Sequence, residues 1–380
     1  MGTKIFWIEG DGIGPEIWRA ARPVINAALA AETSVVTLEW QELLAGEKAV
    51  REVGSPMPEA TLNALRTADL AMKGPLGTPV GTGMRSLNVA LRQGLDLYAC
   101  IRPVRHFQGL ETPVKHPERV NMVIFRENTE DVYAGVEFAA LTPEARKLAS
   151  FLREELGVTK VGDACAIGIK PMTEAGSKRL VRRALRYALD NKLPSLTLVH
   201  KGNIMKFTEG AFRQWGYDVA AQEFGDVTCT EKDMLPGRLV IKDRIADAMF
   251  QEALLRPEQY HVLATPNLNG DYISDALAAQ VGGLGLAPGV NMSDTLAFYE
   301  ATHGTAPTIA GQDKANPGSV ILCGALMLEH IGQPGAAARI RQAVSKAIAA
   351  KAVTADLAPN VTGARVVGCQ EFGEIIGSYL

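Results

Sequence analysis

The chain has 380 residues, of which 47% are hydrophobic and 21% are charged, the balance of a globular protein with room for two domains and a substantial core. Its net charge of −3 argues against a nucleic-acid-binding protein, which needs a clear basic excess. No apolar run approaches the length of about 20 residues that spans a bilayer, and no signal peptide is recognisable at the N-terminus. We therefore expect no membrane partner and a cytoplasmic location, which the five scattered cysteines also favour because none has C-x-x-C spacing.

The first predicted strand, Ile5–Glu9, leads through a glycine-rich turn into a helix that ends near Ala30. The three glycines invite comparison with a Rossmann pyrophosphate loop, but their spacing is G-x-G-x-G rather than G-x-G-x-x-G. In addition, Pro15 suits a helix start, and the carboxylate of Asp11 has the wrong charge to face a pyrophosphate. The turn therefore has a sufficient structural explanation, and the approach of a nucleotide to it stays open.

A long loop follows the next predicted elements, a helix over Pro58–Thr67 and a strand over Leu70–Lys73. The loop, Gly74–Gly83, is rich in glycine and proline, and such loops within compact domains are usually functional or disordered. It leads into a helix near Ser86, whose hydroxyl suits an N-cap. On the residues alone, Ser86 and Asn88 are more simply helix-terminus residues than ligand-binding ones.

Three arginines follow this loop in positions that can converge. Arg92 lies on the predicted helix, Arg102 closes a strand over Leu97–Val104, and Arg126 closes a strand over Asn121–Asn128. Arginine binds planar carboxylates bidentately, and a cation at the end of an apolar strand lies near the sheet edge rather than far out in water. The three guanidiniums together indicate a substrate with several carboxylates.

The region from 131 to about 172 changes character and is our candidate for an arm that projects from the body. It contains a polar helix over 142–156 and short segments around 160–170. The next helix, Glu174–Asp190, is strongly amphipathic, and because the chain is net acidic we interpret its basic stripe as a solvated or interface face. The stripe consists of Arg179, Arg182, Arg183 and Arg186.

Two charged residues follow the later apolar runs. Lys201 comes directly after a buried strand over Leu196–Val199, where it is either a general base or, as is more common for a lone lysine, simply exposed. Leu239–Arg256 is predicted to form a further helix, and its Asp247 is a candidate metal ligand.

A pair of carboxylates follows the apolar run Tyr260–Ala264. We expect Asn267–Gly270 to form a turn and a helix to begin at Asp271, so that Asp271 and Asp275, four residues apart, share one face. Neighbouring carboxylates repel unless a cation lies between them, and their oxygens suit Mg²⁺ or Mn²⁺. Spacing alone favours a simpler interpretation, an acid at a helix N-terminus beside a solvated neighbour.

The C-terminal part contains a second long loop rich in glycine and proline, His303–Gly318, between a strand over Leu296–Glu300 and an apolar helix over Ser319–Ile331. A histidine at one end of this loop and Asn316 near the other suit an adenine ring, which they would hold by stacking and hydrogen bonding.

Six runs of residues, several of them ten residues or longer, then identify a family. They are Glu9–Pro15, Lys73–Arg92, Val120–Gly135, Val199–Gly210, Asn267–Gly283 and Ala301–Ser319. Together they resemble the bacterial homodimeric isocitrate dehydrogenases of the isocitrate/isopropylmalate dehydrogenase family, which are metal-dependent and β-decarboxylating. The resemblance runs from Ile5 to about Gly373, with a short N-terminus and an abbreviated connection between Phe224 and Leu239 as departures.

The resemblance implies an α/β fold of two domains with a mixed sheet, not a Rossmann fold, together with a β-rich clasp. It implies a large domain formed by residues 1–97 and 282–380, a small domain formed by 98–130 and 174–281, and a clasp formed by 131–173. It also implies a homodimer whose active sites are shared between the subunits.

Roles for individual residues follow from the same resemblance. Tyr133 and Lys201 match the catalytic acid/base pair, with Lys201 reaching across from the partner subunit. Asp271 and Asp275 match metal ligands of one subunit and Asp247 that of the other, for Mg²⁺ or Mn²⁺. The residues implied to bind substrate are Thr78, Ser86, Asn88, Arg92, Arg102 and Arg126. Those implied to bind the cofactor are Lys73, Asn203, Arg256, Glu300, His303, Gly304, Thr305, Thr308, Ile309, Asn316 and Asp356.

The implied chemistry is oxidative decarboxylation of isocitrate to 2-oxoglutarate and CO₂. The metal would act as a Lewis acid, Lys201 would help to remove the hydroxyl proton, and Tyr133 would protonate the enolate carbon. A tyrosine has an unperturbed pKa of about 10, so we expect a nearby cation to assist it at neutral pH.

For the cofactor we expect NAD. In NADP-using relatives, lysine and tyrosine hold the 2′-phosphate at the two positions that Thr308 and Ile309 occupy here, and a further tyrosine and arginine are replaced by Ala355 and Pro359. Arg256, which matches a phosphate-contacting residue of the partner subunit, keeps NADP open.

The main prediction is thus an NAD-dependent isocitrate dehydrogenase. Alternatives are an NADP-dependent one, a relative acting on homoisocitrate, isopropylmalate or tartrate, and a catalytically silent regulatory subunit. The last is disfavoured because Tyr133, Lys201, Asp247, Asp271 and Asp275 are all present.

Overall fold

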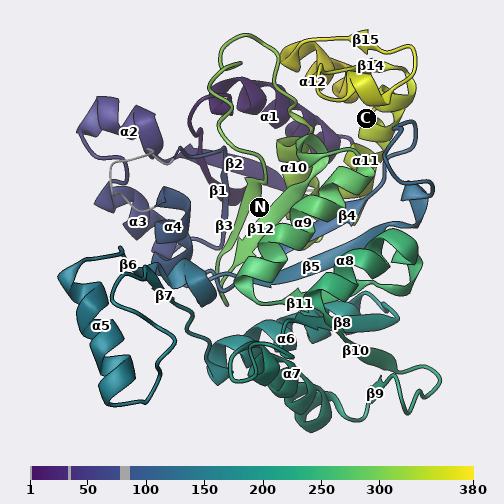
Figure 1. The fold of residues 1–380 in the computed structure, drawn as a ribbon. Coiled ribbons are helices and arrows are strands. Elements are labelled where there is room, and N and C mark those ends of the chain that lie inside the picture. The colour runs from purple at the N-terminus through teal and green to yellow at the C-terminus, as the bar shows by residue number, and fades with distance from the viewer. Residues whose placement is uncertain (1, 33–35, 78–85) are drawn as a thin grey trace.

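The computed structural model describes residues 2–32, 36–77 and 86–380, and within these ranges one sheet of eleven strands runs through the molecule (Figure 1). The order across the sheet is β2-β1-β3-β13-β12-β4-β5-β11-β8-β10-β9. The strands are β1 Gly2–Ile8, β2 Thr37–Glu42, β3 Leu70–Lys73, β4 Ala99–Arg105, β5 Asn121–Glu127, β8 Ser195–His200, β9 Thr228–Thr230, β10 Leu239–Ile245, β11 Val262–Thr265, β12 Pro288–Met292 and β13 Ala297–Ala301.

The sheet is mixed, which confirms the predicted α/β class. Three neighbouring pairings at its centre, β13–β12, β12–β4 and β4–β5, are antiparallel, and the pairings on both sides of them are parallel. Every residue of β3, β8 and β11 is buried, because helices cover both faces of the sheet. This explains why these strands are continuous apolar runs in the sequence rather than alternating ones.

The first and last parts of the chain pack together at one end of the molecule, where the purple and yellow ends of the ribbon meet (Figure 1). There α1 (Gly14–Ala30) contacts α10 (Gly318–His330), α11 (Pro334–Ala349) and α12 (Cys369–Ser378). The other helices are α2 Gly46–Val53, α3 Glu59–Arg66, α4 Leu87–Gly94, α5 Pro143–Glu154, α6 Glu174–Asp190, α7 Glu209–Phe224, α8 Ala246–Leu255 and α9 Asn267–Val281.

The expected arm contains two short strands and a helix. A 3₁₀ turn (η2, Asp131–Ala134) leads into β6 (Val136–Phe138), which pairs antiparallel with β7 (Ile167–Ile169), and α5 lies between them. Figure 1 shows this segment projecting beside the body. The division into large domain, small domain and clasp stays a prediction.

Two predicted elements differ from the structure. Leu239–Ile245 forms a strand, not the start of a helix, because its backbone pairs with β8 on one side and β9 on the other. The helix α9 begins at Asn267, so Asn267–Gly270 is its first turn rather than a separate loop. Gly270 is required for packing, since a Cβ there would lie 2.6 Å from Cγ of Arg126 and 2.3 Å from Oγ1 of Thr265.

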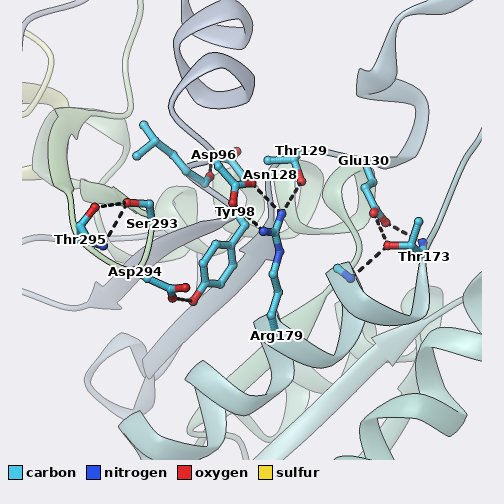
Figure 2. Close-up of polar contacts among 12 residues, drawn as sticks. Asp96, Tyr98, Asn128, Thr129, Glu130, Thr173, Arg179, Ser293, Asp294 and Thr295 are labelled. Atoms are coloured by element: carbon cyan, nitrogen blue, oxygen red, sulfur yellow. Dashed lines mark hydrogen bonds and ion pairs between the residues drawn. The ribbon is translucent and has the colours of Figure 1, made fainter. Parts of the chain in front are cut away.

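The basic stripe of α6 faces acidic and aromatic groups of the same chain. Arg179 donates two hydrogen bonds to Asp96, at 2.7 and 2.9 Å, and its guanidinium lies 4.4 Å from the ring centre of Tyr98. Tyr98 donates a hydrogen bond to Asp294 (Figure 2). Arg183 donates one to the hydroxyl of Tyr98 in turn. Arg179 and Arg183 thus contribute to an interface within the fold, whereas Arg186 is exposed.

The glycine-rich turn after β1 is a packing feature. Asp11 is buried, and its carboxylate accepts hydrogen bonds from the backbone N–H groups of Glu47 and Gly77, both at 2.7 Å. Gly12 has a φ of +59° and lies against Thr305 of the second loop. The turn therefore joins three segments that are distant in sequence. Within the described ranges, no helix has the length and apolar character needed to cross a bilayer.

Replacing Gly12 by alanine tests this packing. The new Cβ would lie 2.1 Å from the carbonyl oxygen of Thr305, so Gly12→Ala must move backbone as well as strain φ, and we expect a loss of about 3 kcal/mol in the free energy of unfolding. The control is Gly54→Ala, at a φ of +74° with nothing within 4 Å of the added atom, for which we expect about 1 kcal/mol. Urea unfolding followed by circular dichroism measures both, and equal losses would contradict the packing role.

Candidate active site

The two strand arginines point to the same face of the sheet, where α9 packs. Cys100 of β4 pairs with Arg126 of β5, so Arg102 lies two residues along on the same face. Both guanidiniums are buried, and both donate hydrogen bonds to side chains of α9. Arg102 lies within β4 rather than at its end, which corrects the predicted position, but the predicted convergence of the two cations is confirmed.

Asp271 forms the centre of this cluster. It makes an ion pair with Nη1 of Arg126 and accepts a hydrogen bond of 2.5 Å from the hydroxyl of Tyr133. Partial burial disfavours the charged carboxylate, but the Arg126 guanidinium and the hydrogen bond from Tyr133 outweigh this and hold the pKa of Asp271 below its usual value. Arg126 also donates to Asn267 through Nε, at 2.9 Å.

Asp275 follows one helical turn later and is half exposed. Nη1 of Arg102 lies 3.1 Å from its carboxylate and also donates to the hydroxyl of Ser274, at 2.7 Å. Partial burial raises the pKa of Asp275, and the charge of Asp271 adds to this effect while Arg102 opposes it. The predicted pair of carboxylates on one helix face is therefore present, with an arginine beside each.

A second group of buried charges adjoins the first. Glu300 of β13 pairs in register with Lys73 of β3, and its carboxylate lies 2.6 Å from the ammonium of Lys73 and 2.6 Å from Nη2 of Arg92. Asn291 of β12 donates a further hydrogen bond to Glu300, at 2.7 Å. Burial alone would raise the pKa of Glu300, but the two cations hold it well below its usual value.

Several of the predicted site residues have a buried polar atom without a hydrogen-bond partner within the described ranges. These atoms are Nε of Arg92, Nε of Arg102, Oδ1 of Asn88 and Nε2 of His303. A buried donor or acceptor without a partner is costly, so such atoms mark where a ligand or water would be bound. Two guanidinium donors suit the carboxylates of a substrate.

The residues of the second loop are also brought together. Asn316 donates to Asp356 at 2.9 Å, and its side-chain oxygen accepts the N–H of Gly318. Nδ1 of His303 lies 3.1 Å from the carbonyl oxygen of Gly304, and burial lowers the pKa of His303. A neutral imidazole with one free nitrogen fits the expected contact with an adenine ring. Thr305 packs against Gly12, Thr308 is exposed, and Ile309 is partly buried.

Other predicted residues lie apart from this cluster. Lys201 makes an ion pair with Asp247, whose side chain is 70% exposed. Asn203 is exposed in the turn after β8, and Arg256 pairs with Glu252 at the end of α8. Among the residues that the structure describes, no three side chains of the metal-binding types are grouped to hold an ion, so one chain does not assemble Asp247 with Asp271 and Asp275.

The start of α4 holds the remaining predicted substrate residues. Ser86 occupies the N-cap position, and Asn88 donates to the carbonyl oxygen of Leu76, at 3.2 Å. Thr78 lies outside the described residues.

Sequence reasoning missed Asn267, Ser274 and Asn291 as members of the cluster. Ser274 lies directly before Asp275 on the predicted helix face, which was a usable signal. Asn291 sits in an apolar strand, and only the register that places it beside Glu300 reveals its role.

A cavity of about 490 Å³ lies on the other face of the sheet, between α6 and α10. Its floor comes from residues that alternate with the arginines, namely Ile101 of β4 and Phe125 of β5. The cavity contains none of the predicted site residues, and the polar cluster under α9 is therefore the candidate active site.

Known proteins resemble this chain over nearly its whole length. A sequence model of the family "Isocitrate/isopropylmalate dehydrogenase" matches residues 4–376. A protein of Pseudomonas aeruginosa named isocitrate dehydrogenase [NADP] is 55% identical, with 97% of this chain and 91% of that protein covered. One of Coxiella burnetii with the same name is 54% identical, with 97% of this chain and 90% of that protein covered.

Two solved structures resemble the fold of this chain. The crystal structure of isocitrate dehydrogenase from Methylococcus capsulatus superposes with a TM-score of 0.81 at 40% identity, covering 99% of this chain and 98% of that one. The TT0538 protein from Thermus thermophilus gives a TM-score of 0.80 at 33% identity, covering 99% of this chain and 68% of that one.

These relatives contradict the prediction of NAD, because their names specify NADP. The prediction rested on the uncharged side chains of Thr308 and Ile309, and on Ala355 and Pro359, which replace a tyrosine and an arginine. A 2′-phosphate can be neutralised by donors from other segments or from a second chain, so the lack of these donors at four positions does not exclude a phosphate site.

The buried Glu300 predicts a large effect on stability. Glu300→Gln would leave the cations of Lys73 and Arg92 without their shared carboxylate, and we expect a loss of about 3 to 5 kcal/mol at neutral pH by urea unfolding. Because the pKa of Glu300 is depressed in the folded state, its contribution is present above the unfolded-state value of 4.5 and shrinks as pH falls below it. The control is Glu329→Gln, because Glu329 is half exposed in its ion pair with Arg341. This change should lower the free energy of unfolding by less than about 1 kcal/mol. A Glu300 variant as stable as this control would refute the argument.

Proposed function

Because the chain belongs to the isocitrate/isopropylmalate dehydrogenase family, we propose that it is an isocitrate dehydrogenase, which oxidises and decarboxylates isocitrate to 2-oxoglutarate and CO₂ with NADP as hydride acceptor. One observation carries the proposal. Arg102 and Arg126 are buried under α9 beside its two carboxylates, and Arg92, whose side chain is 13% exposed, adjoins them through its ion pair with Glu300. Within the described residues, Arg92 and Arg102 each retain an unpartnered Nε.

The charges of this cluster suit a tricarboxylate. Each substrate carboxylate would receive a guanidinium, and the Ser86-x-Asn88 pair resembles the form of the motif that receives the third carboxylate of isocitrate. Relatives that act on isopropylmalate carry a more apolar patch there. The electrostatic preference for an anion with several carboxylates therefore supports isocitrate over a monocarboxylate.

Asp271 and Asp275, with Asp247 from a second copy of the chain, are proposed to hold Mg²⁺ or Mn²⁺. Their oxygen atoms are of the type that these ions prefer, and the exposed side chain of Asp247 is accessible to another chain. When bound, the ion would polarise the substrate hydroxyl and stabilise the negative charge left as CO₂ departs.

A homodimer with shared sites follows from the same reasoning. The segment after Lys201 exposes large apolar side chains, with Phe207 93% exposed and Ile204 70% exposed, and Tyr272 of α9 is 59% exposed. Apolar groups exposed to this extent beside a charged cluster favour burial against a partner. A second copy would bring Lys201 and Asp247 to the face that holds Tyr133 and Asp271.

Tyr133 is proposed as the proton donor to carbon. Partial burial and the hydrogen bond to Asp271 raise the pKa of its hydroxyl, although Arg126 opposes this. The phenol is therefore protonated at neutral pH, which a donor requires, and the guanidinium of Arg126, 4.9 Å from the ring centre, is a nearby cation that lowers this pKa. Lys201 would accept or relay the substrate hydroxyl proton.

For NADP, the group of Lys73, Glu300, His303, Asn316 and Asp356 is proposed to bind the nicotinamide and adenosine ends, and hydride would pass from the carbinol carbon to the nicotinamide. Thr308 and Ile309 carry no charge, so the 2′-phosphate requires a cation from elsewhere. Arg256 of a second copy is the candidate, and it is 55% exposed in this chain.

The first test is turnover of isocitrate by the purified chain. With Mg²⁺ or Mn²⁺ present we expect reduction of NADP with a higher kcat/KM than of NAD, and loss of turnover when a chelator removes the ion. Homoisocitrate, isopropylmalate and tartrate serve as alternative substrates in the same assay. A higher kcat/KM with any of them, or no turnover at all, would overturn the proposal.

The second test concerns the proton donor. Tyr133→Phe should lower kcat for oxidative decarboxylation about 100-fold, because a positioned acid contributes at least that factor, while reduction of the preformed keto intermediate falls much less. Tyr217→Phe, which removes a similar tyrosine–aspartate hydrogen bond of 2.7 Å to Asp243, is the control and should leave both rates unchanged. Equal losses in the two reactions of Tyr133→Phe would assign the proton transfer to another group.

A further inference from the structure

Lys170 lies between two buried carboxylates directly after β7. Its ammonium is 2.8 Å from Oδ1 of Asp131 and 2.6 Å from Oε1 of Glu209. The side chain of Lys170 is 16% exposed, that of Asp131 is 1% exposed and that of Glu209 is fully buried. One ammonium therefore forms ion pairs with two carboxylates that are almost inaccessible to solvent.

Asp131 connects Lys170 to the segment of Tyr133. It is the first residue of η2, where it has a φ of +67°, and its carboxylate accepts the N–H of Val132 at 2.7 Å. Its second oxygen accepts the N–H of Leu268, in the first turn of α9, at 3.1 Å. The position of Asp131 therefore determines how the Tyr133 segment meets the helix that carries Asp271.

Glu209 connects the same ammonium to the segment of Lys201. It is the first residue of α7, and its Oε2 accepts the backbone N–H of Lys201. The same oxygen accepts a hydrogen bond from the side chain of Asn269, again in the first turn of α9, at 2.8 Å. Each carboxylate thus joins one segment bearing a proposed catalytic residue to the start of α9.

The residues that follow Lys170 are held by contacts of their own. The carbonyl oxygen of Pro171 accepts the N–H of Asp131 at 2.9 Å. Two residues later, Thr173 donates from its backbone and its hydroxyl to Glu130, as Figure 2 shows. The chain around Lys170 therefore stays beside the Asp131 segment independently of the ammonium.

The ammonium supplies the charge balance of the group. Without it, two buried carboxylates would face each other with no counter-charge, and at least one of their segments would have to move. Burial disfavours the charge of Lys170, but hydrogen bonds to Asp131 and Glu209 outweigh this and raise its pKa, so it remains charged at neutral pH.

We propose that Lys170 is a positioning residue, which sets through Asp131 and Glu209 the placement of the segments that carry Tyr133 and Lys201 against the start of α9. The inference rests on the proposed function for the roles of those two residues. In a dimer with shared sites, Tyr133 and Lys201 of one chain belong to different active sites. Each Lys170 would therefore position one group in each of the two active sites.

The test compares Lys170→Met with Lys178→Met in the full-length protein. Lys178 also forms a lysine–glutamate ion pair of 2.6 Å, with Glu174 on α6, but contacts neither segment and is the matched control. We expect Lys170→Met to lower kcat for isocitrate about 100-fold, since misplacement by about 1 Å costs that much, with KM changed less than about threefold. Lys170→Arg should recover most of kcat, because it retains the charge.

A second readout does not depend on turnover. Hydrogen exchange of the amides of Lys201 and Leu268 should become at least tenfold faster in Lys170→Met and stay unchanged in Lys178→Met, because these two N–H groups are held by the carboxylates that Lys170 orients. If Lys170→Met does not fold, Glu209→Gln tests the positioning role in its place. For this variant we expect faster exchange of the Lys201 amide and a kcat about tenfold lower than in the wild type.

The outcomes separate the two proposals. If the wild-type chain turns over isocitrate but Lys170→Met matches the control in both kcat and exchange, or a folded Glu209→Gln matches the wild type, the positioning role is wrong. If the wild type shows no turnover while exchange at both amides still accelerates in Lys170→Met alone, the positioning role stands and the proposed function fails.

Discussion

The site depends on charge pairing across the contact between α9 and the central antiparallel strands. Arg126 is almost completely buried, and a guanidinium in that position is tolerated only with an acid and hydrogen-bond acceptors at hand. Asp271 and Asn267, both on α9, supply them. Because Gly270 lets the helix approach Arg126 closely, the same contact that satisfies the cation brings Asp271 under the hydroxyl of Tyr133.

The start of α9 is also where the other functional segments meet. The carboxylates of Asp131 and Glu209 bind its first turn, and Lys170 balances both. The sheet separates this cluster from a cavity on the other side, since residues of β4 and β5 alternate between the two.

A good part of the site was predictable from sequence. The spacing of Asp271 and Asp275 placed them on one helix face. The resemblance singled out Lys73, Glu300 and Arg92 as expected binding residues, and the structure brings these three into one ion-paired group. The strand over Leu239–Ile245 and the role of Asn291 were not predictable, because both depend on which strands lie next to each other. The cofactor was predicted wrongly from the lack of phosphate-binding side chains at four positions, whereas the relatives are named for NADP.

The sequence by itself determined the fold class, the family and the residue types available for chemistry, because apolar periodicity and long motifs are local properties of the chain. Only the tertiary structure decided which charges neutralise one another. Lys170, Asp131 and Glu209 are separated by dozens of residues, and no local pattern links them. Their pairing arises because the fold excludes water from the place where they meet, and a charge buried there requires a partner.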